Sequence, residues 1–249
     1  MREPKNKPHH QDRSDQSRRR ILDAAIKEFS THGLAGARTD AIARAAHVNK
    51  ALLYYYFKDK DALYIATIED VMATVVRSTA IILEQKSTPG EQLLRLALNH
   101  FDRILSQSHF QSLMQQEMVR YQAGESTALP IIVREAFAPL LKQMRDLVRR
   151  GVHSRELVTV DPLQVIYSAF GANVFYFLSA PTMRMALADE SFEPFDLESL
   201  CARRRSAIQF LANALFTDRA HGHKLARRVL ADVPMPEPGP RPPLWRKHL

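Results

Sequence analysis

The chain has 249 residues, of which 45% are hydrophobic and 25% are charged, a balance that is ordinary for a globular protein. Cys201 is the only cysteine, which excludes an intrachain disulfide and any zinc site built from several cysteines. The formal net charge of +8 is concentrated at the ends: residues 1–60 hold 13 Lys and Arg against 7 Asp and Glu, residues 218–249 hold 7 against 3, and residues 61–217 hold 15 against 17.

The N-terminal segment is basic and lacks the apolar stretch of a secretory signal. We expect residues 1–14 to form a flexible basic arm. Such an arm either touches phosphates non-specifically or has no binding role, and we favour the second interpretation. The single cysteine also favours a reducing compartment, so the expected location is cytoplasmic.

An amphipathic helix is predicted over residues 17–33. Ile21, Leu22 and Phe29 recur on one side of it at helical spacing, and Gly33 stands at the expected C-cap position. This helix opens a predicted DNA-binding domain over residues 15–60.

Residues 38–57 predict two short helices joined by a tight turn, the pattern of a helix-turn-helix. Thr39 and Asn49 are the expected N-caps, because their side-chain oxygens can accept hydrogen bonds from the first free N–H groups of a helix. His47 lies in the turn, and histidine tolerates a positive φ better than most residues. In the second helix Leu53 and Phe57 are four apart and can point inward. The residues left for a partner are Lys50, Ala51, Leu52, Tyr54 and Tyr55.

Residues 17–33 and 48–63 resemble the first helix, the recognition helix and the start of the fourth helix of the TetR/AcrR family of ligand-responsive bacterial transcriptional repressors. These motifs cover about a fifth of the chain, and one departure is visible, because the family usually has glycine where this chain has His47. The resemblance implies an all-α fold and a double-stranded DNA operator as partner. It assigns DNA contacts to Arg38, Thr39, Asn49, Lys50, Ala51, Leu52, Tyr54, Tyr55 and Lys60.

The roles within this set follow from matching motif positions. Lys50 is expected to approach a phosphate or a guanine edge, Ala51 to let the helix lie close to the groove floor, and Leu52 to meet a thymine methyl group. Tyr54, Tyr55, Lys60 and Thr39 are expected to hold phosphates, and Arg38 to reach the DNA backbone beside Thr39.

The middle of the chain predicts helix after helix, with Asp59 as the cap of a long helix over residues 60–86. Further helices are expected over 91–106, 110–123 and 129–150, with Gly124 and Gly151 as C-caps. Pro139 should bend or break the last of these, because proline removes a backbone donor and crowds the preceding turn.

Large apolar side chains at helical spacing run through these helices, and each is core more often than pocket. The family resemblance implies a small-molecule effector in a helical effector-binding and dimerisation domain, placed at residues 61–217. The candidates for ligand contact are Phe101, Met114, Met118, Tyr121, Phe137, Met144, Phe170, Asn173 and Phe177, and the polar candidates that orient the ligand are Asn99, His100, Gln115, Asn173 and Tyr176.

Residues 162–183 contain no charged side chain over 22 positions, close to the roughly 20 apolar residues that a membrane span needs. Polar residues and the interruptions at Gly171 and Pro181 favour instead a helix buried in protein on nearly all sides. The segments 162–180 and 196–216 resemble the last two helices of the family, which pair with their copies in a second subunit. This implies a homodimer.

The C-terminal residues 218–249 are basic and rich in proline, which predicts a mostly extended, mobile tail after one or two further helical turns. No catalytic constellation, metal cage or glycine-rich phosphate loop is found, so neither an enzyme nor a cofactor is expected. One alternative stays open, namely a non-specific architectural or membrane-associated protein in which the basic ends matter most.

Overall fold

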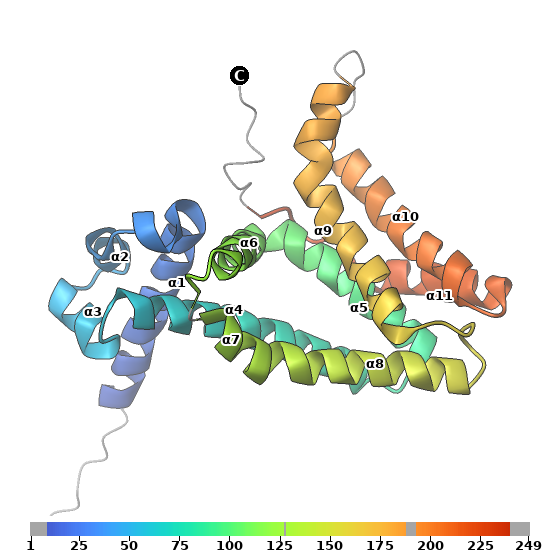
Figure 1. Cartoon of the computed structure of the whole chain (residues 1–249), viewed down its shortest axis with the longest axis horizontal. Coiled ribbons are helices and arrows are strands. Elements are labelled where there is room, and N and C mark those ends of the chain that lie inside the picture. Colours follow the sequence, from blue (N-terminus) through green and yellow to red (C-terminus); the bar gives the residue numbers. More distant parts are fainter. Residues whose placement is uncertain (1–8, 127, 188–192, 240–249) are drawn as a thin grey trace, which may run out of the picture. The chain divides into compact units, whose positions relative to one another are not determined.

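A computed structural model describes residues 9–126, 128–187 and 193–239, and these ranges are helical almost throughout (Figure 1). Apart from an isolated antiparallel bridge between Leu157 and Phe216, the described ranges contain no strand, so the all-α prediction is confirmed. The helices are α1 (His9–Gly36), α2 (Thr39–Ala45), α3 (Lys50–Tyr56), α4 (Lys60–Leu83), α5 (Pro89–Ser106), α6 (Ser108–Gln122), α7 (Ala128–Ile132), the π-helical turn η1 (Val133–Phe137), α8 (Ala138–His153), α9 (Pro162–Ala186), α10 (Leu197–Leu215) and α11 (Arg219–Asp232).

The chain divides into two compact units, which we call the head and the body. The head consists of the described residues up to Thr74 together with His109–Ile132, and the body begins with Val75–Ser108 and resumes at Val133. The predicted domain boundary after residue 60 therefore differs from this division, since α6 and α7 pack with the head.

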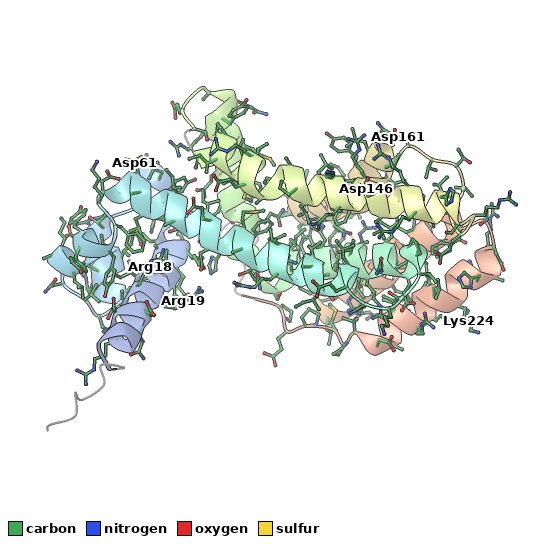
Figure 2. All side chains as sticks on the ribbon, turned by 90° about the horizontal axis from the view of Figure 1, so that it is seen from below. Arg18, Arg19, Asp61, Asp146, Asp161 and Lys224 are labelled. Atoms are coloured by element: carbon green, nitrogen blue, oxygen red, sulfur yellow. The ribbon has the colours of Figure 1, made fainter. Side chains whose placement is uncertain are left out.

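The head is organised around the apolar face of α1. Phe29 is fully buried and meets the ring of Tyr64 edge-on, with centroids 5.0 Å apart. The hydroxyl of Tyr64 donates to the buried carboxylate of Glu117 on α6 over 2.8 Å. Arg19, labelled on α1 in Figure 2, reaches Asp70 on α4 at 2.8 Å. Side chains of α1, α4 and α6 thus fix one another.

Gly33 interrupts α1 rather than ending it. Its φ of 67° lies in the left-handed region, which glycine adopts without the steric cost of a side chain, and helical turns resume up to Gly36. At the other end the helix begins at His9, so residues 9–14 of the predicted flexible arm are helical. Residues 1–8 lie outside the described residues.

Two predicted caps are confirmed and one is wrong. The N–H of Leu52 donates to Asn49 Oδ1, and that of Ala62 to Asp59 Oδ1, both over 2.7 Å. Thr39, by contrast, is the first residue of α2, and Arg38 occupies the N-cap without a side-chain hydrogen bond.

Pro139 divides the predicted helix over 129–150, as expected. It lies in the first turn of α8, where its missing N–H needs no partner, and η1 precedes it. Gly151 lies inside α8 and is not its C-cap. A glycine fits there because a Cβ at this position would come within 2.5 Å of a methyl carbon of Leu157. Gly124 does have the positive φ, 75°, that a C-cap glycine adopts.

The C-terminal segment is more ordered than predicted. α11 is 14 residues long, and its apolar side buries Leu225, Ala226 and Val229 in the core of the body. Asp218 caps the helix by accepting from the N–H groups of Ala220 and His221. Residues 240–249 of the predicted tail lie outside the described residues.

α9 is long and apolar enough to cross a membrane by length and composition, yet only 28% of its most apolar window is buried within the chain. It begins after Asp161 (Figure 2), whose carboxylate accepts from the N–H groups of Leu163 and Gln164. The prediction of burial on nearly all sides is therefore wrong for a single chain. One side packs on the body core, and the other remains uncovered.

Candidate nucleic-acid interface and ligand-binding residues

The turn between α2 and α3 is closed by backbone hydrogen bonds around His47. Its φ is 54°, so histidine occupies the left-handed conformation that the sequence requires of it. The N–H of His47 donates to Arg44 O over 3.1 Å, and that of Val48 donates to Ala43 O over 3.0 Å. The tight turn is thus kept without glycine.

The short helix α3 has a buried side and an exposed side, as its spacing predicts. Leu53 and Phe57 are buried against α1 and α2, together with Ile42. Of the nine predicted DNA contacts none is buried, and Tyr55 is the most open of the large apolar ones, with 80% of its surface exposed. The exposed members are Arg38, Asn49, Lys50, Ala51, Tyr54 and Tyr55, and the half-buried ones are Thr39, Leu52 and Lys60.

An ion pair that the sequence analysis did not predict joins the exposed edges of α2 and α3. Lys50 Nζ lies 2.9 Å from Asp40 Oδ1. The hydrogen bond and charge of Lys50 lower the pKa of the Asp40 carboxyl, and Asp40 in turn raises the pKa of Lys50. The lysine predicted to meet DNA is therefore held beside a carboxylate. The only signal was an acid in the first turn of α2, which is common for helix stability alone.

Other predicted contacts are also held by the head. The hydroxyls of Thr39 and Tyr54 lie 3.2 Å apart, so the two predicted phosphate contacts are adjacent. Lys60 Nζ donates to the carbonyl of Ala35 over 3.1 Å, near the end of α1. The N–H of Arg38 donates to Glu28 Oε1 over 3.0 Å, which fixes the start of α2 against α1.

The predicted ligand contacts do not form one group. In the body Phe101 and Phe177 are buried with ring centroids 5.1 Å apart, and Phe170 meets the ring of His100 at 5.0 Å. Met144 is buried on α8, whereas Phe137 is half-buried in η1. Met114, Met118 and Tyr121 lie on α6 in the head, where the last two are more than half exposed.

Two of the predicted polar residues carry unsatisfied buried atoms in the body. Asn173 donates from Nδ2 to Ala97 O over 3.1 Å, while its Oδ1 has no hydrogen-bond partner among the described residues. The same holds for His100 Nδ1. Burial, reinforced by the charge of Arg103, lowers the pKa of His100 to about 4. The imidazole is therefore neutral at physiological pH.

Arg103 was missed by the sequence reasoning. It lies four residues after Asn99 on α5, is buried, and donates from Nη2 to Asn99 Oδ1 and to Ser78 Oγ on α4, each over 2.5 Å. The available signal was an arginine on the same side of the helix as a predicted polar contact.

A surface pocket of about 300 Å³ lies elsewhere in the body, between α4 and α8. It contains none of the predicted ligand contacts; its lining residues are Ala80, Leu83, Glu84, Gln143, Asp146 (labelled in Figure 2) and Arg150. Within the described ranges no group of three or more His, Cys, Asp or Glu side chains is placed to hold a metal ion.

The sequence matches two family models. Residues 21–67 match the N-terminal model of the bacterial regulatory proteins of the tetR family, and residues 89–210 match a tetracyclin repressor-like C-terminal domain. The first match covers the helix-turn-helix, and the second contains α5 to α9 and most of α10.

Curated relatives agree with these matches. The chain is 30% identical over 104 residues to the transcriptional repressor NicS of Pseudomonas putida, covering 42% of this chain and 49% of NicS. It is 28% identical over 180 residues to the transcriptional regulator RutR of Escherichia coli, covering 69% of this chain and 81% of RutR. The chain thus spans about half the length of the first of these relatives.

The fold agrees as well. The fatty acid degradation regulator FadR of Bacillus halodurans superposes with a TM-score of 0.59 at 21% identity, covering 78% of this chain and 96% of that one. These matches favour a regulator over the architectural or membrane-associated alternative, and over an enzyme. The chain belongs to the tetR family of bacterial regulatory proteins, the DNA-binding transcriptional regulators whose helix-turn-helix α2 and α3 form here.

Proposed function

We propose that this protein is a cytoplasmic homodimeric repressor that binds a palindromic operator through α3 and is released by a small effector bound in the body. The observation that carries the proposal is the exposed edge of α3, whose opposite side is buried and apolar and whose Tyr54 hydroxyl lies 3.2 Å from that of Thr39 on α2. A basic surface needs no such geometry for non-specific binding.

Within this proposal Lys50, Ala51 and Leu52 form the reading edge in the major groove. Tyr54 and Tyr55, with Arg38, Thr39 and Lys60 around them, hold phosphates and fix the orientation of α3. Asn49 acts through its cap, because it sets where α3 begins.

The dimer is supported by an uncovered apolar surface on α9 and α10, which lie side by side in the body (Figure 1). On α9, Tyr167, Phe175 and Leu178 are 66%, 65% and 47% exposed, and on α10 Phe210 is 65% exposed. Apolar surface of this kind is typical of protein or membrane contact. A second copy is the occupant that a helix-turn-helix needs, since two recognition helices gain affinity and specificity from two half-sites.

We place the effector in the body because two of the buried polar atoms that lack partners among the described residues, His100 Nδ1 and Asn173 Oδ1, lie there, and the ring of Phe170 lies beside His100. A mostly apolar site with a few polar groups is the usual form of a small-molecule site. A coupling of roughly 1 to 3 kcal/mol between effector and operator would change operator affinity about 5- to 150-fold.

A gel-shift comparison of the promoter-proximal DNA of its own locus with random DNA of equal length tests this function. We expect a strong preference for the former. Leu52→Ala should alter base preference in a binding-site selection, whereas Tyr54→Phe should weaken binding to all sequences alike. Equal affinity for both DNAs, or an unchanged base preference in Leu52→Ala, would contradict the proposal.

A further inference from the structure

The body buries two arginines and pairs them differently. Arg204 is 5% exposed, and its Nε and Nη2 donate to the two carboxylate oxygens of Asp102 over 2.7 and 2.8 Å. Arg103 is 7% exposed, and both of its hydrogen bonds go to neutral oxygens, those of Ser78 and Asn99. Among the described residues no carboxylate lies within ion-pair distance of Arg103.

A buried guanidinium without a counter-charge is unfavourable, because the charge has lost its hydration and gained no ion pair. Burial accordingly lowers the pKa of Arg103, with no carboxylate to oppose it. Arginine nevertheless stays protonated in proteins. The guanidinium of Arg103 therefore carries its positive charge in a largely buried position.

The guanidinium also has donors to spare. Both described hydrogen bonds leave from Nη2, so the N–H groups of Nε and Nη1 have no partner among the described residues. Both nitrogens therefore keep some exposure to solvent. These donors are free to form charge-assisted hydrogen bonds with an anion that enters.

His100 lies near this charge, and the ring of Phe170 lies beside His100. The charge of Arg103 disfavours protonation of His100. His100 Nδ1 and Asn173 Oδ1 are buried without partners among the described residues. Such buried atoms without partners are rare in folded proteins, and they mark this part of the body as polar as well as aromatic.

We propose that the effector is a small carboxylate with an apolar body, and that its carboxylate binds Arg103 between α4 and α5 while its apolar part lies toward His100 and Phe170. This inference rests on the proposed function, since it names the chemical class of the effector. It assigns Arg103 to ligand binding and Arg204, paired with Asp102, to stability.

The first test compares matched probes on the full-length protein by isothermal titration. The probes are the straight-chain carboxylates from butanoate to dodecanoate and benzoate, each beside its uncharged primary amide. We expect at least one carboxylate to bind, and its amide to bind roughly 10- to 100-fold more weakly, the usual range for a lost charged hydrogen bond. Arg103→Met should remove this preference, and Arg103→Lys should keep part of it. The proposal is overturned if no carboxylate binds better than its amide, or if the preference survives in Arg103→Met.

The second test separates ligand binding from stability. Thermal unfolding without ligand should show a large loss in Arg204→Met, because Asp102 is left buried without its partner, and little or no loss in Arg103→Met. An equal loss in both variants would make Arg103 a structural residue and overturn the proposal.

Operator binding distinguishes this inference from the proposed function. Arg103→Met should bind the operator as the wild type does, and should no longer release it when the preferred carboxylate is added. If the carboxylate binds through Arg103 while operator affinity in the wild type stays constant, the ligand site stands and the release mechanism fails.

Discussion

At the scale of single residues, the ion pair between Asp40 and Lys50 restrains the side chain at the front of the reading edge. Exposed ion pairs contribute little to stability, so this pair is better understood through DNA binding. A carboxylate on the DNA-facing surface repels phosphates and occupies the lysine, and both effects lower affinity for DNA of any sequence.

Asp40→Asn should therefore raise affinity for operator and random DNA together, and leave the preference for the operator largely unchanged. The salt dependence of binding should steepen by about one phosphate contact as Lys50 is freed. Filter binding at several salt concentrations measures both. Asp61→Asn is the matched control, because it removes an exposed acid at the start of α4 that makes no ion pair with Lys50. An identical effect from both variants would show that Asp40 acts only through the net charge of the protein and not through its ion pair with Lys50.

The neutral, half-buried His100 predicts a pH dependence of stability. Its pKa is lowered from 6.5 to about 4, so between these pH values the unfolded chain binds a proton that the folded chain does not. The free energy of unfolding should fall as pH drops from about 6.5 to about 4, by up to about 3 kcal/mol from this residue. Urea unfolding of the wild type and His100→Gln across this range measures the effect. The free energy of unfolding of His100→Gln should fall less steeply with falling pH than that of the wild type. It should still fall somewhat, because burial also lowers the pKa of His109. Parallel pH profiles would contradict the assignment.

At the scale of elements, α3 is only seven residues long and depends on its cap. Isolated helices of this length are unstable in water, so the hydrogen bond from the Leu52 N–H to Asn49 and the packing of Leu53 must hold it in place.

Asn49→Ala should cost about 1 kcal/mol of stability and weaken DNA binding beyond that, because the reading edge loses its fixed start. Asn49→Ser is the control, since serine also caps a helix. Chemical denaturation and gel shifts on both variants provide the comparison. Equal DNA affinity in Asn49→Ala and Asn49→Ser would show that the cap does not position α3.

The second feature at this scale is the attachment of α6 to α1 within the head. Gln116 Nε2 donates to Ser30 O over 3.0 Å, and Ser30 Oγ lies 2.8 Å from His109 Nδ1. α6 follows α5, which carries Arg103, directly in the chain. The head and the body are thus connected along the chain through α6 as well as through α4, which begins in the head and ends in the body.

At the scale of the whole molecule, the proposed dimer contact at the uncovered side of α9 would allow two recognition helices, rather than one, to bind the operator. Phe175→Lys should convert the proposed dimer to a monomer and lower operator affinity sharply, while the fold of the head stays intact. Light scattering coupled to size exclusion measures the mass, and circular dichroism checks the helix content. Ile81→Lys is the control, because Ile81 is 62% exposed on α4. A dimer that persists in Phe175→Lys would place the subunit contact elsewhere.

Features that depend on a few neighbouring residues could be predicted from the amino-acid sequence. Caps at Asn49 and Asp59, the positive φ of His47 and the break at Pro139 follow from local hydrogen bonds and steric limits, and the structure confirms them. The inward face of α3 follows from helical periodicity.

Which distant side chains meet, and which helix faces remain uncovered, could be learned only from the folded chain. Lys50 and Asp40 form an ion pair from two different helices. Arg103 has no carboxylate partner among the described residues, since the neighbouring Asp102 forms its ion pair with Arg204. The packing of α11 on the body was not predicted, because proline and basic residues dominate the composition of residues 218–249. The few apolar residues of α11 are buried only because the core of the body lies against them. Burial and charge pairing depend on contacts between segments far apart in the chain, and periodicity within one segment cannot specify these contacts.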